Sequence, residues 1–525
     1  MTEAGSVETL VLRQERKAMR HHRSLTALGP IAFMAGVTFL ASCGGGGGGS
    51  SPTPPAQPQI QNINSSTTPT SPVNLPIEIN GSGFQSAPGK VTFVQGSISV
   101  DVTPAASAWN DTGIVAQMPA GNGTSNFTTP GTVNVTVTTS AGTSNSVPVN
   151  LVPTLSFNPS AMSWSTTVPL PMPLAGLGAV GVPGLTTASA FAVVSGGFNG
   201  VANTSTVFAI NLNQDGTLGN SANASWTAIT TNPLPAALAH HAMTEADNTN
   251  SPVPLGQRYI YVLGGQINST DTGGTNTVYM APVDATTGAV GTWTALTSTL
   301  PQPLFGLCAT VHNGYLYVAG GISTIGVPVN TVYSAPINSN GTLGTWTTSS
   351  NSLPSARAFG TMFVFGGVIY YIDGDPDSNI LPNDQNVGDP RVYYASAVRG
   401  VVGAWTQNAN STIHNRAKGI LFTAYGQVIS GEGVYTGSIT GSGEMETSTI
   451  NANNTTNVAL NSWNGLTGSS NQVPKANVYN AAGFTSPLVS VTNAPRFLIL
   501  GGQALTGLTG PGGAISSTVY YNNLP

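Results

Sequence analysis

The segment Tyr261-Val262-Leu263-Gly264-Gly265 (YVLGG) decides the fold, because variants of it recur along the chain. Each variant is a short apolar run that ends in glycine: VVSGG at 193–197, YVAGG at 317–321, YYIDG at 370–374, QVISG at 427–431 and LILGG at 498–502. A glycine pair allows backbone angles and a close approach that a side chain would prevent. Six copies therefore predict six similar β-units.

Tryptophans recur in step with the glycines, 53 to 67 residues apart, at Trp164, Trp226, Trp293, Trp346, Trp405 and Trp463. A Val-aromatic pair, such as Val278-Tyr279, lies between glycines and tryptophan. Each unit then holds about four short strands, which bury both faces only when the units are arranged radially. The last pair, Val519-Tyr520, has no tryptophan after it. We therefore expect the segment from Leu155 to Trp164 to complete the last unit and remove a free sheet edge.

This order of apolar-Gly-Gly, Val-Tyr and Trp resembles Kelch repeats and the central propeller of galactose oxidase. The resemblance implies an all-β, six-bladed Kelch-type β-propeller over residues 153–525. It also implies that the loops between strands 2 and 3, and between strands 4 and 1, line one face of the central channel.

Residues 58–152 differ from the repeats. Val133, Val135 and Val137 alternate with polar residues, which predicts strands with one buried face. About ninety residues with such strands suggest an immunoglobulin-like sandwich. The Gly-x-Gly-Phe turn at 81–84, the Trp109-x-Asp111 pair and the late Ala-Gly-Thr at 141–143 resemble the IPT/TIG family, whose domains serve as spacers or binding modules.

The N-terminal segment is predicted to be a targeting signal. A basic flank at 20–23 and an apolar run at 25–40 precede Leu40-Ala41-Ser42-Cys43, which resembles a bacterial lipobox. Residues 1–42 are then a lipoprotein signal peptide, 43–57 a Gly/Pro-rich tether, and Cys43 the lipidated residue. Gly44 favours an outer-membrane or cell-surface location. The acidic residues before Met19 suggest that translation starts at Met19.

Composition argues against nucleic acid as a partner. Only 6% of the 525 residues are charged and the net charge is −5, without the clustered Lys and Arg that nucleic acid requires. We expect a monomer bound to the membrane through its lipid. Cys308 lies in an apolar run and is expected to be a buried thiol.

Enzymes built on similar propellers supply an alternative function. The galactose oxidase resemblance would imply a copper site with a Cys-linked Tyr, a second Tyr and two His. Cys308 is in an apolar strand, and neighbours such as His240 and His241 point to opposite faces of a strand, so copper is not expected. A sialidase-like site would need an arginine cluster and Asp-boxes of the right order. An extracellular carbohydrate-active enzyme, of oxidase or glycosidase type, remains the alternative to a binding protein.

Candidate ligand-binding residues follow the Leu-Pro pairs of the repeats. His240, Arg357, Arg416 and Tyr479 are predicted to face the channel and to recognise an extracellular glycan or protein. A structural role is the other interpretation of each, because isolated polar residues usually satisfy local groups. The inserts at 246–257 and 266–275 are expected to enlarge the same rim.

A further candidate is the acidic segment DGDPDSN at 373–379. Asp373, Asp375, Asp377 and Asp384 fall at positions 1, 3, 5 and 12, the spacing of side-chain ligands in a calcium loop. Serine at position 6 and aspartate at position 12 depart from that pattern. A solvated turn is the alternative, since Asp, Gly, Pro and Asn form turns.

Overall fold

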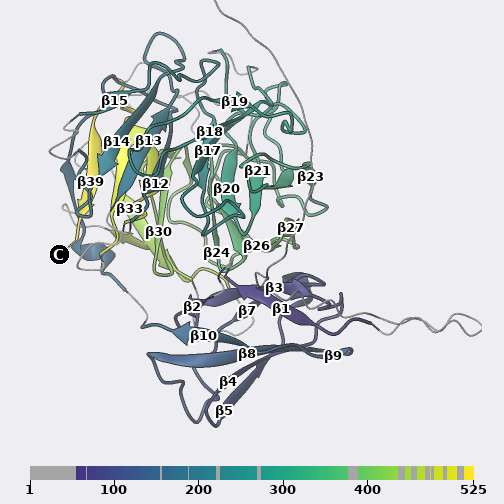
Figure 1. Cartoon of the computed structure of the whole chain (residues 1–525). Coiled ribbons are helices and arrows are strands. Elements are labelled where there is room, and N and C mark those ends of the chain that lie inside the picture. Colours follow the sequence, from purple (N-terminus) through teal and green to yellow (C-terminus); the bar gives the residue numbers. More distant parts are fainter. Residues whose placement is uncertain are drawn as a thin grey trace, which may run out of the picture. The chain divides into compact units, whose positions relative to one another are not determined.

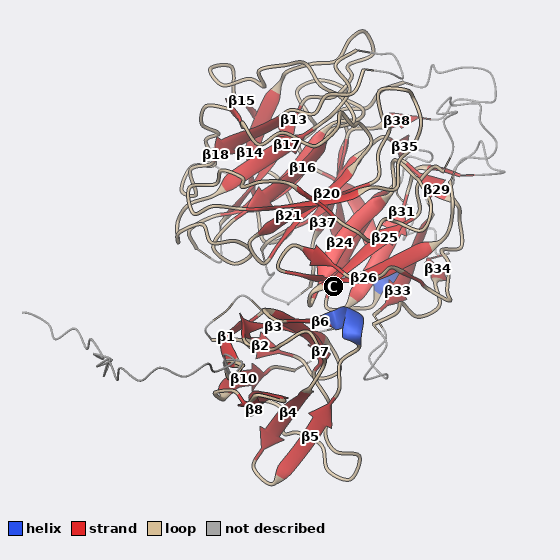
Figure 2. Cartoon of the chain, turned by 90° about the vertical axis from the view of Figure 1, so that its right-hand side faces the viewer, coloured by secondary structure: helices blue, strands red, loops and turns tan. Residues whose placement is uncertain are grey.

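The computed structural model describes residues 55–524, except for short internal gaps at 65, 67, 154–155, 187–188, 220–224, 269–272, 377–387, 436–443, 451–457, 467–472, 474–477, 489–493 and 505–513. Within this part, helix is limited to two single turns at Ala106–Ala108 and Pro159–Ala161, and Figure 2 shows strands and loops elsewhere. The all-β prediction is confirmed. No helix among the described residues is long and apolar enough to cross a membrane. Cys43 and the predicted signal and tether lie outside the described residues, apart from the end of the tether.

Two sheets form from residues 59–151 and lie in two layers in Figure 1. One contains β1 (Gln59–Ile63), β3 (Pro76–Ser82), β7 (Gly113–Gln117) and β6 (Trp109–Asn110). The other is built around β8 (Gly131–Thr139), with β10 (Val147–Leu151), β4 (Lys90–Gln95) and β5 (Ile98–Val102) alongside. Val133, Val135 and Val137 are fully buried between the layers while their neighbours are not, as the alternation predicts.

Six further sheets of four or five strands follow in a propeller-like arrangement, and the described residues also form two two-stranded sheets, β29 (Arg416–Ala417) with β32 (Val434–Tyr435) and β35 (Val478–Tyr479) with β38 (Gln503–Ala504). The first two of the six are β12 (Gly178–Pro183), β13 (Ala190–Ser195), β14 (Val207–Leu212) and β15 (Thr227–Ala228), then β16 (Ala242–Ala246), β17 (Tyr259–Leu263), β18 (Val278–Pro282) and β19 (Thr294–Ala295). The third is β20 (Cys308–His312), β21 (Tyr315–Ala319), β22 (Val332–Pro336) and β23 (Thr347–Thr348).

The fourth sheet is β24 (Thr361–Phe365), β25 (Val368–Ile372), β26 (Val392–Val398) and β28 (Thr406–Gln407), with β27 (Val401–Val402) also paired to β26. The fifth is β30 (Ile420–Ala424), β31 (Gln427–Gly431), β33 (Met445–Thr449) and β34 (Asn464–Leu466). The sixth is β36 (Ala482–Thr485), β37 (Phe497–Leu500), β39 (Val519–Asn523) and β11 (Ser163–Thr166). Trp164 of β11 pairs antiparallel with Asn522 of β39, so a strand from the start of the repeats does occupy the expected place in the last sheet.

The innermost strands contact each other in a circle: β12 with β16, β16 with β20, β20 with β24, β24 with β30, β30 with β36, and β36 with β12. Apolar side chains fill the spaces between neighbouring sheets; Val193 and Ala209, for example, pack in one cluster with Ile260 and Ala281. Several tryptophans reach back to the preceding sheet. The indole N–H of Trp405 donates to the Asn351 carbonyl oxygen at 3.1 Å.

The repeated glycines join one sheet to the next. Gly264 and Gly265 have φ of 58° and 102°, and the Gly265 N–H donates to the Leu304 carbonyl oxygen at 2.9 Å. A Cβ atom at Gly264 would lie 2.4 Å from that oxygen. The same bond recurs from Gly197, Gly321, Gly374 and Gly502. These glycines are therefore required by backbone angle and by close approach.

Two sequence-based details are wrong. In the fifth sheet the left-handed pair is Glu432-Gly433, with φ of 54° and 91°, and not Ser430-Gly431, because β31 continues to Gly431. The two inserts also do not share a rim. Residues 246–257 connect β16 to β17, whereas 266–275 connect β17 to β18. Successive connections in an antiparallel sheet lie at opposite ends of the strands.

Candidate functional site

A ring of backbone hydrogen bonds surrounds one end of the channel formed by the inner strands. Its members precede the first strand of each sheet: Gly176, His240, Gly306, Phe359, Lys418 and Asn480. Each N–H donates to the carbonyl oxygen of the preceding member, and the Gly176 N–H donates to Asn480, over distances of 2.7–3.1 Å. All six have φ between 54° and 62°. We call this feature the mouth ring.

Three bulky residues of the mouth ring hold an unusual backbone conformation. His240, Phe359 and Lys418 are left-handed, which costs free energy for residues with a Cβ. Such angles persist only where the surroundings impose them, and they concentrate at functional sites. The hydrogen bonds of the ring impose them here.

The side chains of the mouth ring gather around a cavity of about 150 Å³. The His240 and Phe359 rings meet edge to face with centroids 5.3 Å apart. The Lys418 Nζ atom lies 4.8 Å from the Phe359 ring centroid and 5.9 Å from that of Tyr479, within the range of cation–π attraction. Of the predicted residues, His240 lines this cavity, whereas Tyr479 lies beside Lys418 and is not among the lining residues. The sequence analysis missed Phe359 and Lys418, because only the ring geometry shows their equivalence to His240.

Both histidines next to the mouth are electrically neutral at physiological pH. Burial lowers the pKa of His240 to about 3, with the Lys418 charge acting in the same direction. Burial alone lowers the pKa of His241 to about 4, and its Nε2 is 3.0 Å from the Ser195 hydroxyl. No group of three or more His, Cys, Asp or Glu side chains that could hold a metal ion occurs among the described residues.

Arg357 is completely buried. Its guanidinium donates to Asp389 Oδ2 at 2.9 Å, to the Asp373 carbonyl oxygen at 2.9 Å and to the Ser355 hydroxyl at 2.6 Å. It also lies 4.7 Å from the centre of the Tyr393 ring. Arg357 is therefore occupied by groups of its own chain.

Arg416 is 1% exposed and similarly engaged. Its Nε donates to Glu446 Oε1 at 3.2 Å, and one terminal nitrogen lies 3.0 Å from His414 Nδ1. The structural role that the sequence left open accounts for the contacts of both arginines. Ligand binding by Arg357 and Arg416 stays a prediction.

The acidic segment is described only in part, since Asp377 and Asp384 lie outside the described residues. Asp373 is 3% exposed and its carboxylate oxygens accept hydrogen bonds from Thr412 at 2.5 Å and Ser430 at 3.3 Å. Burial, reinforced by Glu446, raises its pKa to about 8. Asp375 is 1% exposed. The calcium site stays a prediction.

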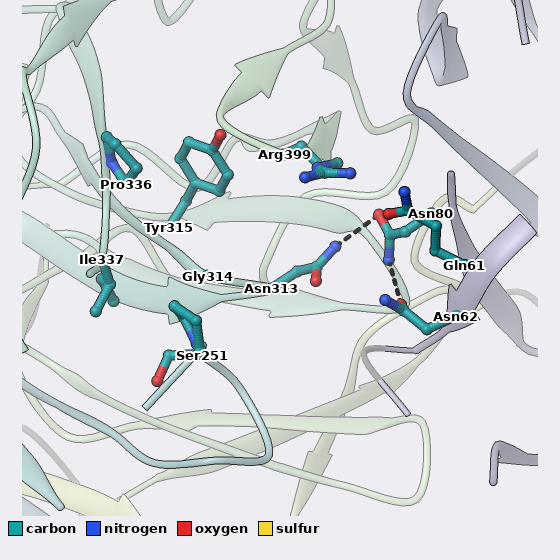
Figure 3. Close-up of a pocket in the computed structure, with 11 residues that line it drawn as sticks. Gln61, Asn62, Asn80, Ser251, Asn313, Gly314, Tyr315, Pro336, Ile337 and Arg399 are labelled. Carbon is teal, nitrogen blue, oxygen red and sulfur yellow. Dashed lines mark hydrogen bonds between the residues drawn. The ribbon is translucent and has the colours of Figure 1, made fainter. Parts of the chain in front are cut away.

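Two further cavities bear on function, and the second adjoins the mouth cavity, with which it shares Leu307, Gly360 and Gly419. One, of about 350 Å³, is lined by polar side chains from β1, β3 and the turn between β20 and β21 (Figure 3). The other, of about 520 Å³, runs along the innermost strands and is lined by Thr244, Thr310, Thr423 and Thr485. Glu245 of β16 also lines this channel cavity.

Glu245 is the acid of the channel cavity. Its Oε1 accepts a hydrogen bond from Asn250 at 3.1 Å, while its buried Oε2 has no hydrogen-bond partner among the described residues. Burial and the nearby Asp247 raise the pKa of Glu245 to about 8, against the opposing effects of Arg258 and Asn250. The carboxyl group is therefore mainly protonated at neutral pH. No motif marks it in the sequence.

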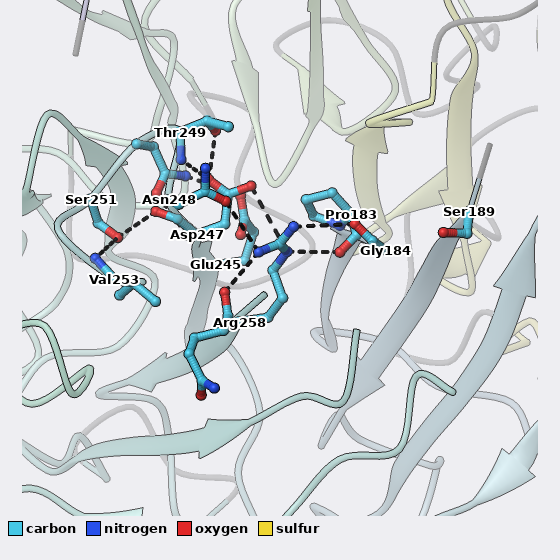
Figure 4. Close-up of polar contacts among 12 residues, drawn as sticks. Pro183, Gly184, Ser189, Glu245, Asp247, Asn248, Thr249, Ser251, Val253 and Arg258 are labelled. Atoms are coloured by element: carbon cyan, nitrogen blue, oxygen red, sulfur yellow. Dashed lines mark hydrogen bonds and ion pairs between the residues drawn. The ribbon is translucent and has the colours of Figure 1, made fainter. Parts of the chain in front are cut away.

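The groups behind Glu245 are held by the connection from β16 to β17 (Figure 4). Asp247 accepts hydrogen bonds from Thr249, and its other oxygen lies 4.0 Å from Arg258 Nε. Arg258 donates to the carbonyl oxygens of Pro183 and Gly184 at 2.8 and 3.1 Å. The insert thus fixes the positions of the charges that act on Glu245.

Comparison with known proteins gives only a weak structural likeness. No protein-family model and no curated protein matches the chain. A solved structure titled "Structure of YjhT" shares 14% sequence identity with a TM-score of 0.43, over 67% of this chain and 95% of that chain. The Kelch and IPT/TIG assignments therefore stay predictions.

Proposed function

We propose that the protein is a lipid-anchored binding protein of the cell envelope that recognises an extracellular glycan or protein at the mouth ring. In this proposal the six sheets are the blades of a Kelch-type propeller, the sandwich is an IPT/TIG-like spacer, and the Cys43 lipid holds the molecule at the outer membrane or cell surface. Calcium bound by the acidic segment would order one loop of the rim.

One observation carries the proposal: three bulky side chains are held at left-handed positions around one cavity. Backbone strain of this kind concentrates at functional sites, where it holds a side chain in a required position. Lys418 supplies a cation, neutral His240 and Asn480 supply hydrogen-bond donors and acceptors, and Phe359 supplies an aromatic edge. This combination suits a ligand with both hydroxyl groups and apolar faces.

Glycine variants test the mouth ring directly, because glycine adopts left-handed angles without strain. We expect His240→Gly, Phe359→Gly and Lys418→Gly to keep the fold and to lose binding on a panel of extracellular glycans and envelope proteins. Tyr425→Gly is the matched control, since Tyr425 also has a positive φ, of 52°, but lies between β30 and β31. Equal binding by all four variants would contradict the proposal.

The lipid anchor has its own test. Mass spectrometry of the mature chain should find a diacylglycerol-modified Cys43 as the first residue, and Cys43→Ser should release the protein from membranes. An unmodified N-terminus beginning before residue 43 would contradict this part of the proposal.

A second function, an enzyme acting on extracellular carbohydrate, is favoured by Glu245 alone. A carboxylic acid that is protonated at neutral pH and lines a cavity of about 520 Å³ is suited to general acid catalysis. Turnover on a glycan panel that disappears in Glu245→Gln would support the enzyme. Saturable binding without turnover would support the binding protein.

A further inference from the structure

The 350 Å³ pocket of Figure 3 contains convergent polar groups and lies apart from the mouth ring. Its volume is within the range of small-molecule sites in proteins. Its apolar lining includes Pro252, Pro336 and Ile337, and Tyr315 lines it as well. The polar lining comes from Gln61, Asn62, Asn80, Ser251, Asn313 and Arg399.

Hydrogen bonds fix one wall of this pocket. Asn80 donates to Asn62 Oδ1 at 3.0 Å and accepts from Asn313 Nδ2 at 2.8 Å. The Asn313 amide also donates to Glu78 Oε1 at 2.8 Å, and Glu78 is completely buried. The wall is therefore organised before any ligand arrives, which reduces the entropy cost of binding.

Arg399 occupies a strained position in the turn between β26 and β27. Its φ is 46° and that of Gly400 is 83°, a pair of positive angles that hairpin turns usually fill with Asn-Gly. Arginine is unfavourable there because its Cβ meets the backbone. An observed outlier of this kind points to a function for the side chain.

Buried hydroxyl groups clamp the same turn. The Gly400 N–H donates to the Tyr317 hydroxyl at 2.9 Å, and the Ser334 hydroxyl donates to the Gly400 carbonyl oxygen at 2.7 Å. A Cβ atom at Gly400 would lie 2.5 Å from the Tyr315 ring. The turn is thus held in place, and the Arg399 side chain extends toward the side of the pocket with Gln61 and Asn80 (Figure 3).

Arg399 also lacks a partner in the part of the chain that the structure describes, where no ion pair or hydrogen bond of its guanidinium is found. Arg357 and Arg416 are paired with carboxylates instead. A guanidinium presents a planar fork of donors that matches a carboxylate. The neighbouring amides and hydroxyls donate and accept hydrogen bonds, as a ligand with several hydroxyl groups requires.

We propose that this pocket binds a sugar residue that carries a carboxylate, with Arg399 pairing with the carboxylate and the amide wall binding the sugar hydroxyls. The apolar faces of Tyr315, Pro336 and Ile337 would cover the C–H face of the sugar ring. This site goes beyond the mouth ring and stands on separate residues, so either can fail without the other.

The test is a calorimetric titration of the full chain with glucuronate, and a second titration with glucose as the neutral probe. We expect saturable binding of glucuronate, at least tenfold weaker in Arg399→Gly, and weak binding of glucose that the variant leaves unchanged. Arg399→Gly relieves the strained turn, so its melting temperature should equal or exceed that of the wild type. Loss of binding then cannot be explained by loss of the fold.

Lys90→Gln is the matched control for net charge. Lys90 is exposed on β4, pairs with Asp101 at 2.7 Å and does not line the pocket. Its variant should bind glucuronate like the wild type. The proposal is overturned if the wild type binds no glucuronate, if Arg399→Gly binds it equally well, or if Lys90→Gln weakens binding as much as Arg399→Gly does.

Discussion

Arg357 and Arg399 flank the same sheet, yet their surroundings are opposite. Arg357, before β24, is completely buried and donates to a carboxylate, a hydroxyl and backbone carbonyl oxygens. Arg399, after β26, lines a pocket from a strained turn. Arg357, which the sequence analysis selected as a ligand-binding residue, is held by contacts within the protein. Arg399, which it did not select, faces solvent-accessible space. In a chain with few charges, the informative question is which charges the fold leaves uncompensated.

The largest effect should come from Arg357→Met. Removing one member of a buried ion pair leaves polar groups unsatisfied and typically costs about 3–5 kcal/mol. Urea denaturation should show this loss in the free energy of unfolding. Arg391→Met, which removes the half-exposed partner of Asp389, should cost less than about 1 kcal/mol. Equal losses would break the distinction between buried and exposed cations.

Calcium should produce the next largest effect if the acidic segment binds it. At a calcium concentration 100 times the dissociation constant, binding to the folded state adds about 2.7 kcal/mol. The melting temperature should then rise between EDTA and millimolar calcium, and the rise should vanish in the double variant Asp375→Ala, Asp377→Ala. Identical melting curves in the wild type would leave the segment as a turn.

Glu245 should affect the pH dependence of stability. Its pKa is raised from an ordinary 4.5 to about 8, so the folded state holds a proton that the unfolded state has released between those values. Its contribution is complete below pH 4.5 and is lost as the pH rises toward 8, at no more than about 1.4 kcal/mol per pH unit. Melting temperatures measured from pH 5 to 8 should fall less steeply in Glu245→Gln.

Asp373 is the internal reference for that experiment. Its pKa is also raised to about 8, and it remains in both proteins, so the difference between the curves isolates Glu245. His240 and His241 act in the opposite direction, because their lowered pKa values remove stability only as the pH falls below about 6.5. Parallel curves would show that Glu245 titrates normally.

The smallest effect on stability should come from Arg399→Gly, and it should have the opposite sign to that of Arg357→Met. Relief of the left-handed backbone should outweigh the added freedom of glycine in the unfolded chain, giving a gain of up to about 1 kcal/mol. Denaturant titration checks this value. A clear destabilisation would show that Arg399 has a structural role like that of Arg357.

The sequence predicted the fold better than the site, for physical reasons. YVLGG and its variants repeat because a Cβ at Gly264 would strike the Leu304 carbonyl oxygen, and such constraints leave a pattern that one sequence can reveal. Asp373 and Glu432 stand where other sheets have the first glycine of the Gly-Gly pair. In the fifth sheet this substitution led the sequence analysis to place the pair at Ser430-Gly431 instead of Glu432-Gly433. His240 and Phe359 share no residue type, so their common place in the mouth ring appears only in the backbone angles.

The pocket at Arg399 was beyond sequence analysis for a different reason. Its wall consists of asparagines from β1, β3 and the turn after β20, and Asn313 of that turn is 233 residues from Asn80 in the sequence. A single asparagine in a chain rich in Asn, Ser and Thr carries no signal. Arg399 itself could have been noticed, because Arg-Gly in a hairpin turn departs from the usual Asn-Gly.

The pairing of β11 with β39 has a consequence for how the molecule is made. Trp164 and Asn522 are paired neighbours in the sixth sheet, although almost the whole repeat region separates them in the sequence. The sixth sheet therefore cannot receive its outer strand until the ribosome has added residue 523. A nascent chain with five sheets lacks the strands that cover β12 and β30. Contacts this distant in sequence form slowly, and partly built chains of this kind are prone to aggregation. Biosynthesis therefore requires that the chain be kept from misassembly until synthesis is complete.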